Sequence, residues 1–176
     1  MKRSAALIFA LLAACAPSPK HQSASPTPTP GVSGAPPLLV TGAGTRNHPV
    51  RIVQQRGNRT LYELTARSYT SRSANGMATA TFHRVHITFY GHHGHRLLAA
   101  APQAYVDEAR KLVTMTGGVT ARSNDGLVLR CRRLTYDQAG GMLHGRGDVY
   151  IVDRHGMRAS GSRFDSNVSF TRMQMQ

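Results

Sequence analysis

The sequence predicts an all-β protein: a twisted jelly roll or flattened sandwich built from repeated hairpins. Three observations support this fold class. Residues 117–134 and 147–164 resemble each other at a spacing of thirty residues, apolar and polar residues alternate within each copy, and no segment of the folded part has a helical apolar stripe. Repeats of this length are typical of stacked supersecondary units, and a period of two is typical of β-strands.

The first fourteen residues are predicted to be a lipoprotein signal peptide. A charged start, Met1-Lys2-Arg3, precedes an apolar run at residues 5–14. That run is much shorter than the roughly twenty residues of a membrane-spanning helix. It ends in LAAC at residues 12–15, which resembles the bacterial lipobox, in which the cysteine is lipidated. We therefore expect Cys15 to be a lipid anchor and the mature N-terminus.

Residues 15–41 are predicted to be a lipidated tether rich in proline, serine and threonine. This segment has almost no apolar residues to bury, and its prolines favour an extended chain. Residues 42–173 then form a single predicted domain. About 130 residues are enough for one modest core and too few for two ordinary domains.

The repeat predicts how the strands are arranged. A shift of thirty places Gly117 on Gly147 and Gly126 on Gly156, and apolar positions coincide on both sides of the glycine turn. Weaker copies are found at residues 85–104, with a turn at GHHGH (91–95), and at residues 61–70. Each copy is therefore predicted to be a β-hairpin that is apolar on one face, and such hairpins can bury that face only by stacking into two facing sheets or a closed barrel.

The charge predicts an anionic partner. The formal net charge is +14, and removal of Lys2 and Arg3 leaves 20 basic and eight acidic residues, a charge of +12. Without tryptophan or a basic-aromatic motif, an exported chain fits anionic lipid or saccharide better than nucleic acid. Nine arginines share the even-numbered, outward register: Arg84, Arg96, Arg110, Arg122, Arg130, Arg132, Arg146, Arg154 and Arg158.

Small residues are frequent on the predicted inner face. Such residues leave either a well-packed core or enough space for an acyl chain, and the sequence leaves both interpretations open. The small inward positions are Ala99, Ala101, Ala121, Ala159, Gly145 and Gly161.

The stretch LVTMTGGVTARSNDGLVLRCRRLTYDQAGGMLHGRGDVYIV, residues 112–152, resembles the LptC family and its LptA and OstA relatives, periplasmic proteins of lipopolysaccharide export. The likeness extends over residues 50–170. It implies a twisted β-jelly roll that receives lipopolysaccharide from an inner-membrane ABC transporter. The acyl chains then pass along the interior to an LptA-like bridge protein, which docks through strand edges.

The resemblance also implies a set of inward-facing, lipid-binding residues, and neither a catalytic group, a metal nor a cofactor. Three further expectations come from the residues themselves: attachment to the membrane through Cys15, no contact with nucleic acid, and contact with a second copy through exposed strand edges. The implied lipid-binding residues are Val85, Ile87, Phe89, Val113, Met115, Val119, Ala121, Leu127, Leu129, Leu143, Val149 and Ile151.

One feature departs from the family pattern. Members usually carry one N-terminal transmembrane helix, whereas this chain has a predicted lipid anchor. We expect it in the periplasm of a Gram-negative bacterium, on the inner membrane rather than the outer. The competing interpretation is a lipoprotein with a solid β-sandwich core that binds anionic glycolipid or a protein partner without transporting it.

Three other motifs carry weaker predictions. The segment LLVTGAGTR (38–46) lacks the following helix and acid that a dinucleotide site needs. The histidines of GHHGH are expected in a solvated turn rather than around a metal, and Cys131 as a buried apolar residue rather than a nucleophile. No spacing of acids, serines and histidines argues for catalysis, so we expect a protein that is not an enzyme.

Overall fold

The computed structural model describes residues 38–74 and 77–176, which form eleven β-strands and contain no helix. The predicted signal peptide, Cys15 and most of the predicted tether lie outside these residues. The all-β prediction is confirmed. The strands are β1 (Leu38–Ala43), β2 (Val50–Arg56), β3 (Arg59–Ala66), β4 (Ser68–Ala74), β5 (Met77–Tyr90), β6 (Arg96–Asp107), β7 (Leu112–Ser123), β8 (Val128–Asp137), β9 (Met142–Val152), β10 (Arg158–Asn167) and β11 (Met173–Met175).

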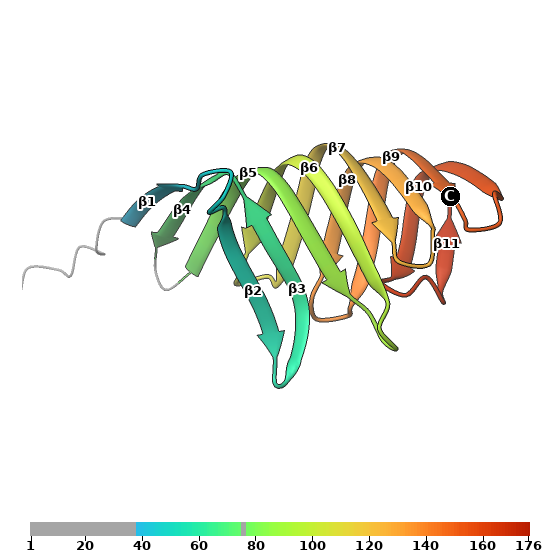
Figure 1. Cartoon of the computed structure of the whole chain (residues 1–176), viewed down its shortest axis with the longest axis horizontal. Helices are drawn as coiled ribbons and strands as arrows, with labels where there is room; N and C mark the ends of the chain where they lie inside the picture. The colour runs from blue at the N-terminus through green and yellow to red at the C-terminus, as the bar shows by residue number, and fades with distance from the viewer. Residues whose placement is uncertain (1–37, 75–76) are drawn as a thin grey trace, which may run out of the picture. The chain divides into compact units, whose positions relative to one another are not determined.

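All eleven strands belong to one antiparallel sheet (Figure 1). Its order is β1-β4-β5-β6-β7-β8-β9-β10-β11, and β3 pairs with β5 beyond the end of β4 and carries β2 at its other edge. From β5 onward each strand pairs with the next along the chain. The predicted hairpin repeat is therefore present: β7 and β9 begin thirty residues apart, as do β8 and β10.

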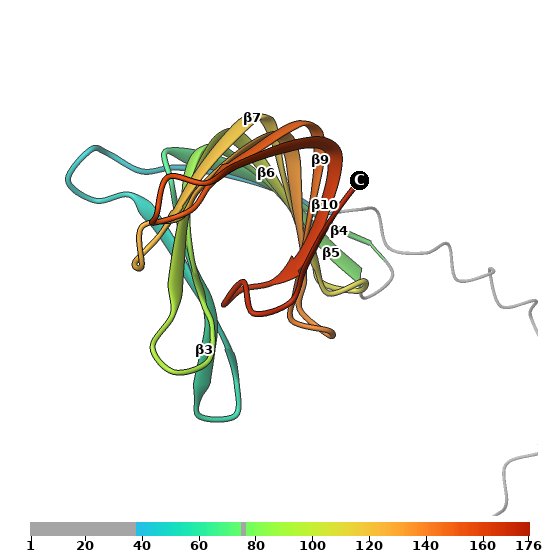
Figure 2. The ribbon, with the colours of Figure 1, turned by 90° about the vertical axis from the view of Figure 1, so that its right-hand side faces the viewer.

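A line of irregularities crosses the middle of the long strands and bends the sheet. The register shifts by one residue in each pairing from β6–β7 to β9–β10. In β7 the bend falls at Gly117 and Gly118, whose φ angles of 89° and 91° disfavour residues with a Cβ. At the other end it falls between β3 and β4, at Arg67, opposite Arg84 (φ 53°). Aligned bulges of this kind increase strand bending, and Figure 2 shows the sheet arched around its interior.

The bend divides the sheet into two facing layers. One layer, here layer A, contains β1, β4, β11 and the strand halves at 77–83, 103–107, 112–116, 133–137, 142–146 and 163–167. The other, layer B, contains β2, β3 and the halves at 85–90, 96–100, 119–123, 128–130, 149–152 and 158–161. The turns at 108–111, 138–141 and 168–172 form the rim of layer A. Those at 57–58, 91–95, 124–127 and 153–157 form the rim of layer B. This two-layer arrangement fits the predicted jelly roll or flattened sandwich.

One hydrophobic cluster fills the space between the layers and draws side chains from β3 and from β5 to β10.

The folded domain begins earlier than the sequence predicts. Strand β1 begins at Leu38, four residues before the predicted domain start and within the predicted tether, because Leu38–Ala43 pairs along its whole length with β4. The nine arginines predicted to face outward are all exposed, so that part of the register is confirmed. Residues 38–74 and 77–176 include no helix of the length and hydropathy needed to cross a membrane.

Candidate functional site

The twelve residues predicted to line the interior all lie in the hydrophobic core. Their side chains are between 0% and 8% exposed, Leu127 being the most exposed at 8%. They come from four strands, β5, β7, β8 and β9, and from the turn before β8, and all belong to the same cluster. The inward register is therefore confirmed. Their contact with lipid stays a prediction.

The small residues of the interior divide into two groups. Ala99, Ala101, Ala121 and Gly145 are buried as expected. Gly161 is half-buried. Ala159 lies opposite the buried Ile151 and so shares its inward face, but it is exposed, so its predicted burial is wrong. It lies in the first half of β10, whereas the last strand, β11, pairs only with Phe164–Ser166 in the second half. The apolar layer-B face therefore ends before β10.

The prediction missed buried side chains whose alternation is reversed by the bend. Leu134, Tyr136 and Phe164 are even-numbered and fully or almost fully buried, at 0%, 2% and 0% exposure. In β8 the register shifts between Arg130 and Arg133, so even positions point inward beyond it. Because side chains alternate strictly along a strand, one extra residue exchanges the two faces. The run from Cys131 to Leu134, with two charged residues between the apolar ones, is the sequence signal of that bulge.

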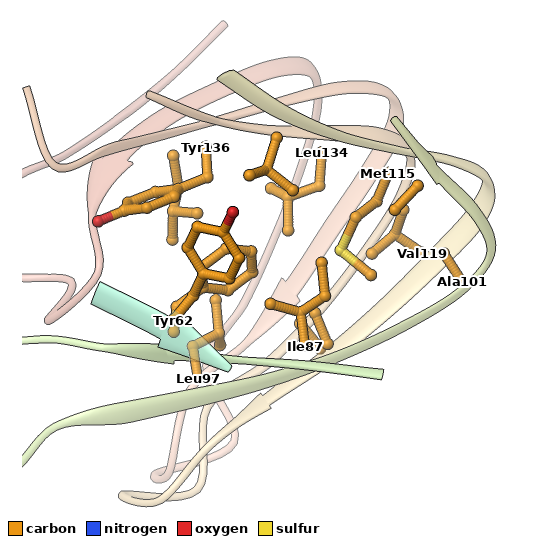
Figure 3. Packing of buried hydrophobic residues seen from close by; sticks show 14 of the residues in the cluster. Tyr62, Ile87, Leu97, Ala101, Met115, Val119, Leu134 and Tyr136 are labelled. Atoms are coloured by element: carbon orange, nitrogen blue, oxygen red, sulfur yellow. The ribbon is translucent and has the colours of Figure 1, made fainter. Parts of the chain in front are cut away.

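An aromatic cluster connects the two layers near their rims (Figure 3). The ring of Tyr136, in layer A, lies 4.9 Å from that of Phe89 and 6.3 Å from that of Tyr62, both in layer B. Such tilted and edge-on contacts contribute roughly 0.5–1.5 kcal/mol beyond the buried area. The cluster therefore holds the layers together from inside.

The hydroxyl of Tyr62 is buried in this cluster and has no hydrogen-bond partner among the described residues. Burial raises the pKa of the Tyr62 phenol far above its ordinary value, with smaller contributions from Glu108 and Tyr136. Burial also raises the pKa of Tyr136, while Arg59 and Arg56 act in the opposite direction. The aromatic cluster therefore contains one hydroxyl group, that of Tyr62, buried among apolar side chains.

We expect Tyr62→Phe to stabilise the protein by about 1–3 kcal/mol, because it removes a buried hydroxyl that is not hydrogen-bonded and keeps the ring. Urea unfolding would show a higher midpoint at an unchanged slope. Tyr136→Phe is the matched control, since the Tyr136 hydroxyl is not among the buried groups without a partner. A less stable Tyr62→Phe protein would mean that the hydroxyl has a partner in solution.

The rims of the two layers meet at one place, which we call the mouth: turns 57–58 and 91–95 of layer B against turns 138–141 and 168–172 of layer A. Two hydrogen bonds cross it. Arg56 Nη2 donates to the carbonyl oxygen of Gln138 over 2.7 Å, and the His92 backbone N–H donates to Ser169 Oγ over 3.2 Å. Both bonds are partly buried, and each is expected to stabilise this contact by about 0.5–1.5 kcal/mol.

A cavity of about 430 Å³ lies at the mouth. Its exposed part carries Arg56, Arg59 and Arg172, and its buried part carries Leu61 and Tyr136. None of the described residues that line it is an aspartate or glutamate. The mouth is therefore a cationic opening above an apolar interior.

Arginines also gather on the outer face of the bend. Arg146 lies directly opposite Arg133 on β8 and Arg163 on β10. Like charges at opposed positions of a sheet destabilise it slightly. Arg132 is neutralised in part by Asp148, to which its Nε donates over 2.5 Å. This outer surface favours an anionic neighbour.

Two further predictions concern single motifs. The GHHGH segment forms the turn between β5 and β6, as expected, and His92 and His93 are exposed. In residues 38–74 and 77–176 no three His, Cys, Asp or Glu side chains gather closely enough to hold a metal ion. Cys131 is buried in β8, and burial raises the pKa of its thiol to about 11. It is therefore a protonated apolar side chain at neutral pH, as predicted.

The fold and the site together define a class: an all-β jelly roll with an apolar interior, a cationic mouth and an arginine-rich exterior. Comparison with known proteins adds no narrower assignment. No protein-family model matches the chain, and no curated protein matches it.

Proposed function

We propose that the protein is a non-enzymatic, lipid-anchored periplasmic component of lipopolysaccharide export. In this proposal it takes lipopolysaccharide from an inner-membrane ABC transporter, holds the acyl chains between its two layers, and passes them to the next bridge protein. Cys15, outside the described residues, would anchor the chain to the membrane. The sequence resemblance described above motivates the choice of lipopolysaccharide among anionic lipids.

The observation that carries the proposal is the apolar interior and its position behind a mouth closed by few contacts. The interior extends across β3 and β5 to β10, so its long dimension runs from strand to strand across the sheet. Each Å² of apolar surface removed from water contributes about 25 cal/mol. An acyl chain lying along this interior would therefore bind firmly, and its release requires either an energy source or an equally apolar neighbour.

The sheet edges support the handover step. Within the described residues, β1 pairs only with β4, β2 only with β3, and β11 only with β10. The β1 edge is also apolar, since Leu38, Leu39 and Val40 are 64%, 58% and 41% exposed. An unpaired edge of this kind is suited to adding a strand from another chain. Docking there would extend the sheet, and with it the interior, into the partner.

Photo-crosslinking in living cells tests this function. A photoreactive residue at Val119, which is 2% exposed, is expected to form adducts with lipopolysaccharide. The same residue at Arg122, which is exposed on the outer face of the same strand, β7, is the control and is expected to form none. If both proteins are folded and exported and neither labels, the transport proposal is wrong.

A second candidate is a lipoprotein with a solid core that binds an anionic partner on its surface. The observation favouring it is that Leu64, Val113, Leu129 and Leu143 are 0% exposed and pack in a single cluster. Acyl chains can enter such an interior only if the two layers separate. Depletion of the protein would stall lipopolysaccharide export under the first proposal and leave it unchanged under the second.

A further inference from the structure

We propose that the mouth binds a phosphate group carried by an amphiphilic ligand. Arg56, Arg59 and Arg172 supply the positive charge, and the side-chain amide of Gln138 supplies a buried donor. This inference rests on the lipid-binding function proposed above, and it adds the chemistry and position of the head group.

The cavity has the size and the two-sided character of a head-group site. Its volume of about 430 Å³ lies within the range of about 300–1,000 Å³ that is usual for small-molecule sites. Leu61, Tyr136 and Val168 line it and are themselves 6%, 2% and 5% exposed, so they belong to the core. A ligand in this cavity therefore touches the apolar interior on one side and charged groups on the other.

The three arginines come from both layers. Arg56 and Arg59 flank the turn between β2 and β3, and Arg172 lies in the turn between β10 and β11. Asp137, next to Gln138 in sequence, accepts a hydrogen bond from the Ala139 N–H over 2.8 Å and so is used by its own turn. Arginines that line one cavity from both layers concentrate positive potential there, and their planar donors match phosphate oxygens.

Gln138 gives an independent reason to place a ligand here. Its side chain is 2% exposed and lines the cavity, and its Nε2 has no hydrogen-bond partner among the described residues. The backbone of Gln138 is already satisfied, since its N–H donates to Lys111 and its carbonyl accepts from Arg56. Buried polar groups are almost always paired, so an unpaired amide requires an explanation. A phosphate oxygen in the cavity would be its acceptor.

Phosphate suits this arrangement better than carboxylate does. Three guanidinium groups and one amide present more donors than the two oxygens of a carboxylate can accept, whereas a phosphate monoester has three terminal oxygens and a charge near −2. The apolar interior directly beneath the arginines favours a phosphate attached to acyl chains over a free anion.

The test compares ligands with and without phosphate on the full-length protein. The probes are diphosphorylated lipid A, dephosphorylated lipid A and inorganic phosphate, with dissociation constants measured by calorimetry. We expect the wild type to bind the diphosphorylated lipid at least tenfold more tightly than the dephosphorylated one. Substitution of the three mouth arginines by glutamine should remove that preference. Gln138→Leu should weaken the preference for the diphosphorylated lipid several-fold.

The control variant removes the same number of positive charges from exposed positions that do not line the cavity: Arg130→Gln, Arg154→Gln and Arg158→Gln. It should keep the preference, and an equal loss would overturn the mouth site in favour of unspecific attraction. If the wild type binds both lipids equally, the phosphate site is wrong while lipid binding stands. If inorganic phosphate binds through the mouth arginines and neither lipid binds, then the ligand is not an amphiphile, and both this inference and the proposed function are wrong. No binding of any probe would overturn both proposals.

Discussion

A disulfide between the two rims is expected to abolish lipid loading, reversibly. Gly91 and Ser169 face each other across the mouth, and a Cβ added to Gly91 would lie 2.5 Å from Ser169 Oγ. Gly91 does not have a positive φ, so it can carry a side chain. In the oxidised Gly91→Cys, Ser169→Cys protein the layers cannot separate. Binding of fluorescent lipopolysaccharide should therefore weaken at least tenfold, as measured by anisotropy, and recover after reduction.

The same bond makes the result easy to interpret. Closing so long a loop is expected to raise the free energy of unfolding by roughly 4 kcal/mol, so lost binding cannot be attributed to unfolding. Cys131 should not exchange with the new pair, because it is buried and its pKa of about 11 keeps it a thiol. The two single variants, Gly91→Cys and Ser169→Cys, treated identically, are the controls. Full binding by the oxidised double variant would show that chains do not enter through the mouth.

The alternation of apolar residues was sufficient to predict the fold and the inward face of most strands. Residues such as Ile87, Val113 and Leu129 lie at odd positions in uninterrupted strand halves, where sequence period and geometry agree. The alternation failed at Leu134 and Phe164, because each follows a register shift that exchanges the two faces. Ala159 failed for another reason: burial requires a facing strand, and local periodicity carries no information about where facing strands end.

The mouth, in contrast, is not visible in the sequence. Arg56 and Gln138 are 82 positions apart and meet only because the bend brings the two rims together. The thirty-residue repeat does not single out either residue as part of a site. Glycine turns with basic neighbours recur along the whole chain. A site assembled from four turns depends on the sheet's curvature, which results from bulges whose positions only the structure gives.

The bend gives the protein two separate basic surfaces, one on the outer side of the sheet and one at the mouth. The arginine row of Arg133, Arg146 and Arg163 follows the outer side of the bend, opposite the buried face. A phosphorylated amphiphile with its chains between the layers would present its charge at the mouth, whereas a membrane or a sugar-phosphate polymer would meet the outer row. The mouth and the outer arginine row would therefore contact different partners. For this reason the charge-matched control replaces arginines that lie outside the mouth.

The largest loss of stability is expected from Phe89→Ala, and the response of that variant to lipid separates the two functions. Phe89 is 0% exposed and contacts both tyrosines of the aromatic cluster. Its removal should cost about 3–5 kcal/mol and leave an apolar cavity beside the mouth. Leu98→Ala, at a position 55% exposed on the outer face, is the control and should change stability by no more than about 0.5 kcal/mol.

Thermal unfolding with and without lipid A then distinguishes the proposals. A ligand that binds only the folded state raises its melting temperature, and an apolar cavity can be refilled by an apolar ligand. If acyl chains occupy the interior, lipid A should raise the melting temperature of the wild type and of Leu98→Ala equally, and that of Phe89→Ala by more. A solid core that binds only at its surface gives the same shift in all three proteins, because a ligand on the outer face does not contact the space that Phe89 leaves.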